Sequence, residues 1–166
     1  MLNELLMEMI RYDGGDAKRI QHFVKVHAFA KLIGEMEHLE EETLRTLEAA
    51  AYVHDIGIKA AESKYGSCNG KLQEQEGPAV AREMLERLGF EEKLIERVCY
   101  LVGHHHTYTE IDGIDYQILV EADFLVNIYE DHLEKSAASV CEKIFKTQSG
   151  KQICKTMFVC EGRAAF

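Results

Sequence analysis

The feature that most constrains this chain is the spacing of its apolar residues, which follows a period close to 3.6 almost throughout. That period lines apolar side chains along one face of an α-helix, whereas a half-buried strand would alternate apolar and polar residues. No run of alternating Val, Ile, Thr and Tyr is long enough to make a sheet. The sequence therefore predicts an all-α fold, a single-domain helical bundle.

Helix start and stop signals divide this pattern into segments. Asp16 suits the N-cap of a long helix, and Gly57 and Gly89 are expected just past helix ends. Pro78, the only proline, suits the first turn of another helix. The segment 59–76 contains two glycines and an asparagine, and we expect a loop there that covers a functional site. The predicted helices span about 2–11, 17–37, 41–55, 78–88, 91–103, 115–130, 133–145 and 151–160.

The length and composition are those of one globular domain. A chain of 166 residues falls within the typical domain size of roughly 100–200 residues. Hydrophobic residues make up 46% and charged residues 29%, which is typical of a folded protein rather than a disordered or fibrous one. We expect residues 1–166 to form one domain, with a core at about 16–130 and C-terminal helices at about 133–160.

Charge and cysteine usage exclude several classes of partner. The net charge of -10 argues against a nucleic-acid backbone, because its binders normally carry a basic face. A small anionic substrate remains compatible, since a metal ion can supply local positive charge. No window is apolar enough to span a membrane. Five cysteines without a CxxC pair, and acidic residues in the N-terminal apolar stretch, predict a cytoplasmic protein whose cysteines are small core residues.

Three predicted helices carry a polar group where a simple bundle would have an apolar one. His22 shares its stripe with Val26, Phe29, Ala30 and Ile33. By itself, such a residue is more often a hydrogen-bonded core histidine than a metal ligand.

The other two helices carry His54 with Asp55, and Asp123. An adjacent histidine and carboxylate at a helix end can turn toward one point, and Asp123 has apolar neighbours at spacings of three and four. Burying that carboxylate is costly unless it meets a cation. A salt bridge or a helix-cap contact would explain Asp123 alone. One cation shared by the three helices explains all of these residues together.

The segments RIQHFVKVHAFAKLIGE, AAAYVHDIGIK and LVEADFLVNI resemble the H…HD…D signature of HD-domain metal-dependent phosphohydrolases, over about residues 19–130. The resemblance implies an all-helical fold and hydrolysis of phosphate mono- or diesters, commonly of nucleotides. It also implies that His22, His54, Asp55 and Asp123 bind a metal, with His54 and Asp55 as catalytic residues.

A second, narrower resemblance joins EQEGPAVAREML and VCYLVGHHHTYTEIDGIDYQ to the HD-GYP phosphodiesterases. In that family a histidine before the proline-containing helix and a His-His pair hold a second metal, which the HD aspartate bridges. Here Glu76 stands in place of that first histidine, two extra residues follow the histidines, and the Gly-Tyr-Pro segment is replaced. The expected ligands are Glu76 and His105, with His106 or His104 as the next. The alternatives are that Glu76 is an ordinary surface carboxylate and that the three histidines form a solvated helix end.

Two cations are candidate phosphate ligands, namely Arg19, which faces the same side as His22, and Lys59, which follows the HD pair. The alternative for each of them is a plain surface cation. The mixture of imidazole and carboxylate ligands favours manganese or iron, with nickel, cobalt and zinc also compatible, as one or two ions.

The predicted function is hydrolysis of a phosphate ester by a metal-activated water. The expected substrate is a nucleotide or another small phosphorylated metabolite. Two alternatives remain open: a phosphodiesterase acting on a signalling nucleotide, and a regulatory module that binds a metal or a nucleotide without turnover.

Overall fold

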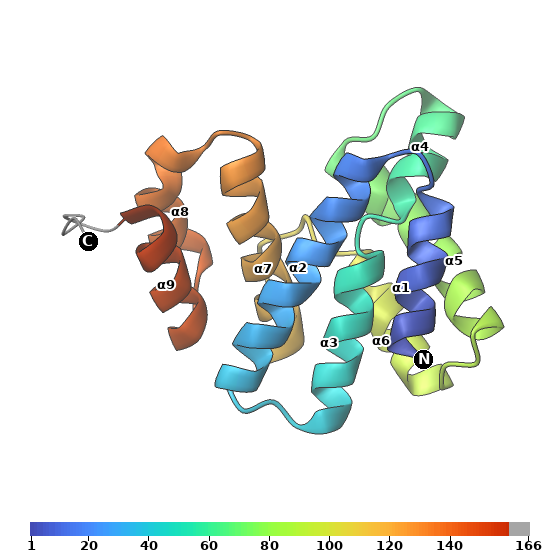
Figure 1. Ribbon diagram of the computed structural model, residues 1–166, viewed down its shortest axis with the longest axis horizontal. Coiled ribbons are helices and arrows are strands. Elements are labelled where there is room, and N and C mark those ends of the chain that lie inside the picture. The colour runs from blue at the N-terminus through green and yellow to red at the C-terminus, as the bar shows by residue number, and fades with distance from the viewer. Residues whose placement is uncertain (160–166) are drawn as a thin grey trace.

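The computed structural model describes residues 1–159, and these residues form helices and connecting segments with no strand among them (Figure 1). The all-α prediction is therefore confirmed. The elements are α1 (Leu2–Tyr12), α2 (Ala17–Met36), α3 (Glu41–Val53), α4 (Gly57–Tyr65), α5 (Gly70–Arg87), α6 (Glu92–Val102), α7 (Ile114–Glu130), η1 (Glu134–Ser136), α8 (Ala137–Ile144), α9 (Gln148–Cys154) and the π-helical turn η2 (Lys155–Val159).

The centre of the molecule is formed by α2, α3 and α7. Helix α2 packs against both α3 and α7, and α3 also contacts α1, α6 and α7 (Figure 1). Val26 of α2, Leu47 of α3 and Leu119 of α7 are fully buried in the common core. Asp16 caps α2 as predicted, since its side chain accepts a hydrogen bond from the backbone N–H of Arg19. The three helices that carry the predicted ligands thus lie side by side.

The prediction of a long loop at 59–76 is wrong, because most of that segment is helical. Helix α4 ends at Gly66, whose φ of 64° is a left-handed conformation that suits glycine. Helix α5 begins soon afterwards, capped by the side chain of Asn69, which accepts from the N–H of Leu72. These loop signals mark a short turn between two helices. Pro78 consequently lies inside α5 rather than in its first turn.

Gly57 opens α4 instead of following α3 into a loop. A Cβ atom on this residue would lie 2.5 Å from the carbonyl oxygen of Gln73 and 2.8 Å from the backbone nitrogen of Gly77. The backbones of α4 and α5 therefore touch at this crossing. The contact holds α5, and Gln73 on it, close to the turn that follows α3.

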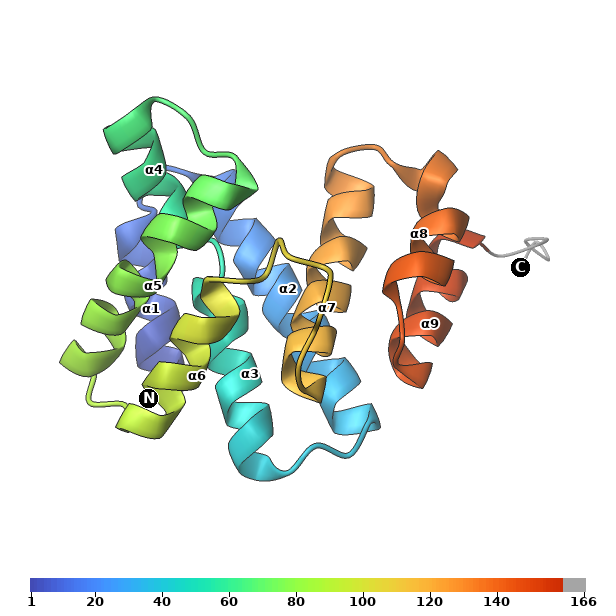
Figure 2. The same cartoon turned by 180° about the vertical axis from the view of Figure 1, so that it is seen from behind.

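Seen from behind, α5 and α6 pack against one another, and the segment 103–113 runs from α6 to the start of α7 (Figure 2). Arg97 of α6 holds the end of this segment. Its guanidinium donates to both carboxylate oxygens of Asp115, at 2.7 and 2.8 Å, and to Asp112. The three consecutive histidines follow α6 at the beginning of this segment.

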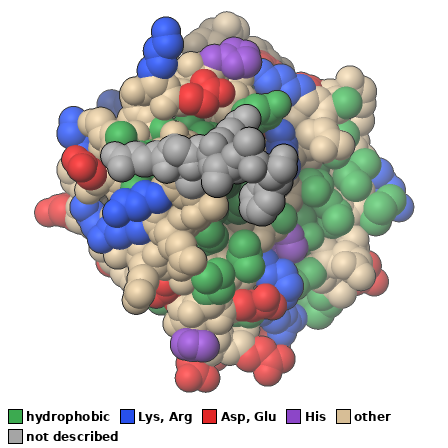
Figure 3. Space-filling model, turned by 60° about the vertical axis from the view of Figure 1, so that its left-hand side comes forward, with side chains coloured by type: hydrophobic (Ala, Val, Ile, Leu, Met, Phe, Trp, Pro, Cys, Tyr) green, Lys and Arg blue, Asp and Glu red, His purple; other side chains and the backbone are tan. Residues whose placement is uncertain are grey.

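The C-terminal elements α8, α9 and η2 stand at one end, where α7 contacts α8 and α9 (Figure 1). The carboxylate of Glu121, fully buried on α7, accepts from the backbone N–H groups of Lys146 and Thr147. Thr147 also caps α9, so this helix begins at Gln148, earlier than predicted. Viewed from this end, hydrophobic side chains are interspersed with charged ones (Figure 3).

Cys141 and Cys154 are buried, in agreement with their predicted role in the core, whereas Cys68 and Cys99 are half-buried. Cys160, which was expected to end the last helix, lies outside the described residues. Within residues 1–159, no helix is both long and apolar enough to cross a lipid bilayer.

Candidate metal centre

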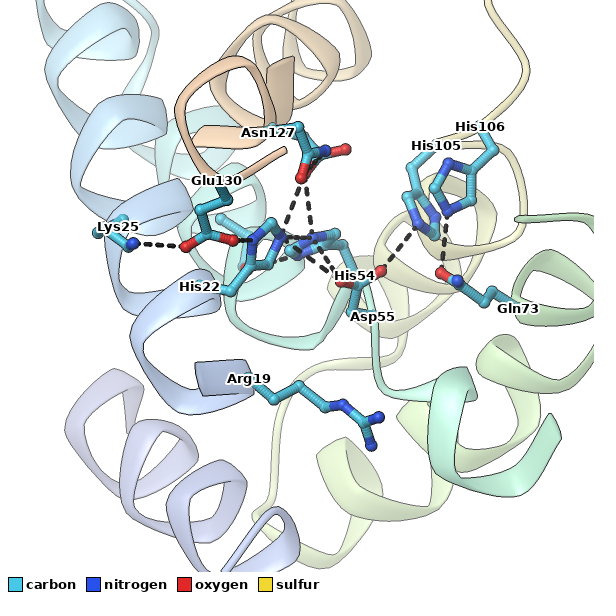
Figure 4. A network of polar contacts seen from close by, with 12 residues as sticks. Arg19, His22, Lys25, His54, Asp55, Gln73, His105, His106, Asn127 and Glu130 are labelled. Carbon is cyan, nitrogen blue, oxygen red and sulfur yellow. Dashed lines mark hydrogen bonds and ion pairs between the residues drawn. The ribbon is translucent and has the colours of Figure 1, made fainter. Parts of the chain in front are cut away.

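The imidazoles of His22 and His54 face one another across the junction of α2 and α3, with their Nε2 atoms 3.2 Å apart. The Nδ1–H of His54 donates to the carbonyl oxygen of Ala51 at 2.9 Å, and the Nδ1–H of His22 donates to the carboxylate of Glu130 at 2.9 Å (Figure 4). Since a neutral imidazole carries one proton, both Nε2 atoms present lone pairs to the same point. Two such acceptors at this distance repel one another unless a positive charge, either a proton or a metal ion, lies between them.

Asp123 of α7 completes this group. Its Oδ1 lies 3.2 Å from the Nε2 of His22 and 3.6 Å from the Nε2 of His54. The side-chain amide of Asn127, one turn later on α7, donates to the same oxygen at 2.9 Å and orients it. The ligand atoms of His22, His54 and Asp123 are close enough to one another to hold one ion.

Asp55 faces two groups at once, because α3 ends beside it. Its Oδ2 lies 3.5 Å from the Nε2 of His22 and 3.4 Å from the Nε2 of His54. Its Oδ1 lies 3.4 Å from the Nε2 of His105, on the other side (Figure 4). A carboxylate with one oxygen turned to each of two donor groups is suited to bridge two cations.

The second group consists of Asp55, His105 and His106. His105 donates from Nδ1 to the carbonyl oxygen of Val102 at 2.8 Å, which leaves its Nε2 as an acceptor. That Nε2 is the one buried side-chain nitrogen or oxygen in the described chain that lacks a hydrogen-bond partner. His106 contacts the side-chain oxygen of Gln73 through Nε2 at 2.9 Å, so its Nδ1 remains available.

The electrostatics of the cluster favour positive charge at its centre. Burial alone would lower the pKa of His54, but the carboxylates of Asp55 and Asp123 outweigh it and raise that pKa to about 9, so that the Nε2 of His54 holds a proton that a metal ion would displace. Burial would raise the pKa of Asp123, yet His22 and His54 hold it well below its usual value. Burial and the neighbouring His105 lower the pKa of His106 to about 4, which keeps this ring neutral, as metal ligation requires.

These residues fit divalent transition metals on several counts. Each of His22, His54 and His105 is held through Nδ1, so that a bare Nε2 is directed inward. The Nε2 of His105 accepts no hydrogen bond from the described protein atoms and lies 3.4 Å from Oδ1 of Asp55, so an ion held between these two atoms would satisfy both. Imidazole nitrogens with carboxylate oxygens make up a donor set that transition metals accept.

The two groups lie at the base of a cleft of about 540 Å³. Arg19 lines this cleft below His22 (Figure 4). Its guanidinium is fixed by Glu62 at 2.9 Å and Asp16 at 3.4 Å. The cleft is lined by Asp16, Lys18, Arg19, His22, Asp55, Ile58, Cys68, Gln73, His106, Asp123, Asn127, Glu130 and Asp131.

Three of the residues singled out in the sequence are not brought into the cluster. The carboxylate of Glu76 contacts Lys64 at 3.0 Å and the hydroxyl of Tyr65 at 2.8 Å. His104 donates from Nδ1 to the carbonyl oxygen of Tyr100 and stacks on its ring. Lys59 contacts the backbone carbonyl and the ring of Tyr12. On α5 the residue that lines the cleft is Gln73, three places before Glu76.

The residues that support the ligands were not predicted from the sequence. Asn127 and Glu130 lie four and seven residues after Asp123, so the helical period alone would have placed them on the same face. Gln73 was not predicted to support the site, because the segment 59–76 was expected to be a loop. The helical period identifies these supporting residues only when the bounds of the helices are known.

The family model of the HD domain matches residues 19–147, which is most of the chain. This chain belongs to the HD-domain family. The resemblance noted in the sequence is thereby confirmed, and HD domains are in general metal-dependent phosphohydrolases that bind divalent metals. Comparison with curated proteins and with solved structures found no match.

Proposed function

We propose that this HD domain is an enzyme that hydrolyses a phosphate ester of a nucleotide or another small phosphorylated metabolite. The observation that carries the proposal is the convergence of bare histidine Nε2 atoms and two aspartates at the base of a cleft. A purely structural role would account for the facing Nε2 atoms of His22 and His54 through a shared proton, but it would not account for Asp55 facing His105 on its other side.

The residues of the chain have distinct tasks in this proposal. A bound divalent ion would polarise a phosphoryl oxygen and lower the pKa of a water molecule. His22, His54, Asp55 and Asp123 hold that ion. Arg19, fixed by its two carboxylate partners, presents its guanidinium to the phosphoryl oxygens. The ligand set favours manganese or iron, with cobalt, nickel or zinc as substitutes.

A second ion is part of the proposal. Asp55, His105 and His106 would hold it, and the two oxygens of Asp55 would contact one ion each. Glu76 and His104, the other expected ligands, engage Lys64, Tyr65 and Tyr100 instead. The proposed second position therefore has fewer protein ligands than the sequence suggested.

The test uses turnover of an aryl phosphate and metal content, both measured with added Mn²⁺. His22→Gln is expected to lose bound metal and turnover together. His27→Gln is the matched control, because His27 lies on the same helix but pairs with Glu48, and it is expected to keep both. Retention of metal and rate in His22→Gln would contradict the proposal. Stoichiometric metal without turnover in the unchanged protein would favour a regulatory module, and turnover of a diester alone would favour a phosphodiesterase.

A further inference from the structure

Resting on the proposed function, we infer that the cleft selects phosphate monoesters whose leaving alcohol is neutral or cationic. Esters whose alcohol carries a further phosphate or carboxylate are disfavoured. The substrate class that fits is the monophosphate of a small polyol or amino alcohol.

The inference starts from the charges of the cleft wall outside the two ligand groups. Two cations, Lys18 and Arg19, line the cleft. Three carboxylates line it as well, those of Asp16, Glu130 and Asp131. The wall therefore has no surplus of positive charge with which to bind an additional anion.

Arg19 is also less available than its charge suggests. Arg19 contacts Asp16 and, outside the cleft lining, Glu62, so its charge is already offset on two sides. One phosphoryl group can share this guanidinium with the metal ions. A second anionic group would meet the exposed carboxylate of Asp131 at the end of α7. Like charges in a cleft repel one another and lower affinity.

The remaining lining residues suit hydroxyl and ammonium groups. Gln73 and Asn127 bring amide groups to the cleft, and the carboxylates provide hydrogen-bond acceptors. Ile58 and Cys68 are its apolar residues, and the lining residues include no Phe, Tyr or Trp ring on which a nucleobase would stack. Polar alcohols that are uncharged or cationic match this surface better than alcohols that carry a flat nucleobase or several negative charges.

The test compares glycerol 3-phosphate with 3-phosphoglycerate, which share a carbon skeleton and differ by a carboxylate. For the Mn²⁺-loaded protein, kcat/KM is expected to be about tenfold higher for glycerol 3-phosphate, because the carboxylate of 3-phosphoglycerate meets a wall on which three carboxylates accompany two cations. In Asp131→Lys this ratio is expected to fall by about threefold or more, the scale of an exposed charge pair.

The matched control is Glu134→Lys, which changes the net charge equally three residues further along, at a residue that does not line the cleft. It is expected to leave the ratio unchanged. An equal kcat/KM for the two esters in the unchanged protein, or an equal response of the two variants, would overturn the inference.

Measurements of ester binding distinguish a failure of this inference from a failure of the proposed function. If the protein hydrolyses no ester, the proposed function fails, and the dissociation constants of the two esters for the Mn²⁺-loaded protein are compared by calorimetry. Tighter binding of glycerol 3-phosphate, reduced in Asp131→Lys only, would still support the inference. Equal binding of both esters, or binding of neither, would reject it.

Discussion

Glu130 fixes the orientation of His22. It accepts a hydrogen bond from Nδ1 of this histidine and also contacts Lys25, so its carboxylate is half-buried with two partners. Burial would raise the pKa of Glu130, but Lys25 and His22 outweigh burial and lower it. The ionised carboxylate keeps the Nδ1 proton in place and thereby leaves Nε2 free for a metal.

We expect Glu130→Leu to weaken metal binding by roughly 10–100-fold, the usual cost of losing such a support. Glu130→Gln retains an oxygen acceptor for Nδ1–H and is expected to restore most of the affinity. The measurement is a titration with Mn²⁺ or Co²⁺. Glu48→Leu is the control. Glu48 contacts His27, which lies on α2 as His22 does but is not one of the proposed ligands. An unchanged dissociation constant in Glu130→Leu would show that the contact with His22 has no such role.

His105 and His104 are neighbours in the chain with different environments. His105 is 1% exposed and directs an unpartnered Nε2 toward Asp55, whereas His104 stacks on Tyr100. We expect His105→Asn to reduce the number of bound Mn²⁺ ions from two to one, and His104→Asn to leave it at two. Metal analysis after equilibrium dialysis decides the matter. Equal stoichiometry in the two variants would reject a second ion at His105.

At the scale of helices, the sequence predicted most elements because their apolar period is regular and their ends carry caps, as Asp16 does for α2. The prediction for the segment 59–76 was wrong for a physical reason. Gly66 and Asn69 were read as parts of one loop, but one ends a helix and the other begins the next. Helix α4 is short, and its stability depends on packing against α5, which local sequence does not reveal.

The crossing of α4 and α5 depends on Gly57. A Cβ atom there would collide with backbone atoms of Gln73 and Gly77, which cannot rotate away. We expect Gly57→Ala to lower the free energy of unfolding by about 2 kcal/mol or more, as overpacking does. In Gly77→Ala the close neighbour is a methyl group of Val102, at 2.6 Å, which can shift, so the loss should be smaller. Urea denaturation measures both, and equal losses would contradict this account.

The contact between α2 and α9 should be sensitive to acid. The side chain of Ser149, together with its backbone N–H, which donates to the Glu37 carboxylate at 2.7 Å, lowers the pKa of Glu37 below 4.5. A lowered pKa adds stability that is present above pH 4.5 and lost as the pH falls through the folded-state value. Thermal midpoints between pH 3 and 7 are expected to fall less steeply in Glu37→Gln. Parallel curves for the two proteins would exclude this contribution.

At the scale of the whole molecule, the sequence pointed to His22, His54, Asp55 and Asp123 because three predicted helices each carry such polar groups, and because of the resemblance to HD domains. The structure places these four side chains together, with Asp55 facing both groups. The second group was harder to predict, since three consecutive histidines differ only in the direction that the turn after α6 gives them. That direction depends on how α6 packs, and no local pattern encodes it.

Metal should stabilise the entire fold, because the proposed ligands join α2, α3, the segment after α6, and α7. At 100 times the dissociation constant, an ion that binds only the folded chain adds about 2.7 kcal/mol. For a chain of this size we expect the thermal midpoint to rise by roughly 5–10 °C. Scanning calorimetry with Mn²⁺ and with chelator measures this rise, and Asp123→Asn should show little of it. A thermal midpoint that is the same with Mn²⁺ and with chelator would argue against the proposed metal site.

The position of Asp123 also bears on how the centre is assembled during synthesis. His22 and Asp123 lie about a hundred residues apart, so the ribosome must complete α7 before both can meet. Before that, the nascent chain brings candidate ligands together only locally, as in the His54-Asp55 pair and the three histidines at 104–106. The proposed centre is complete only after folding, so the finished bundle, rather than the emerging polypeptide, would select which metal it retains.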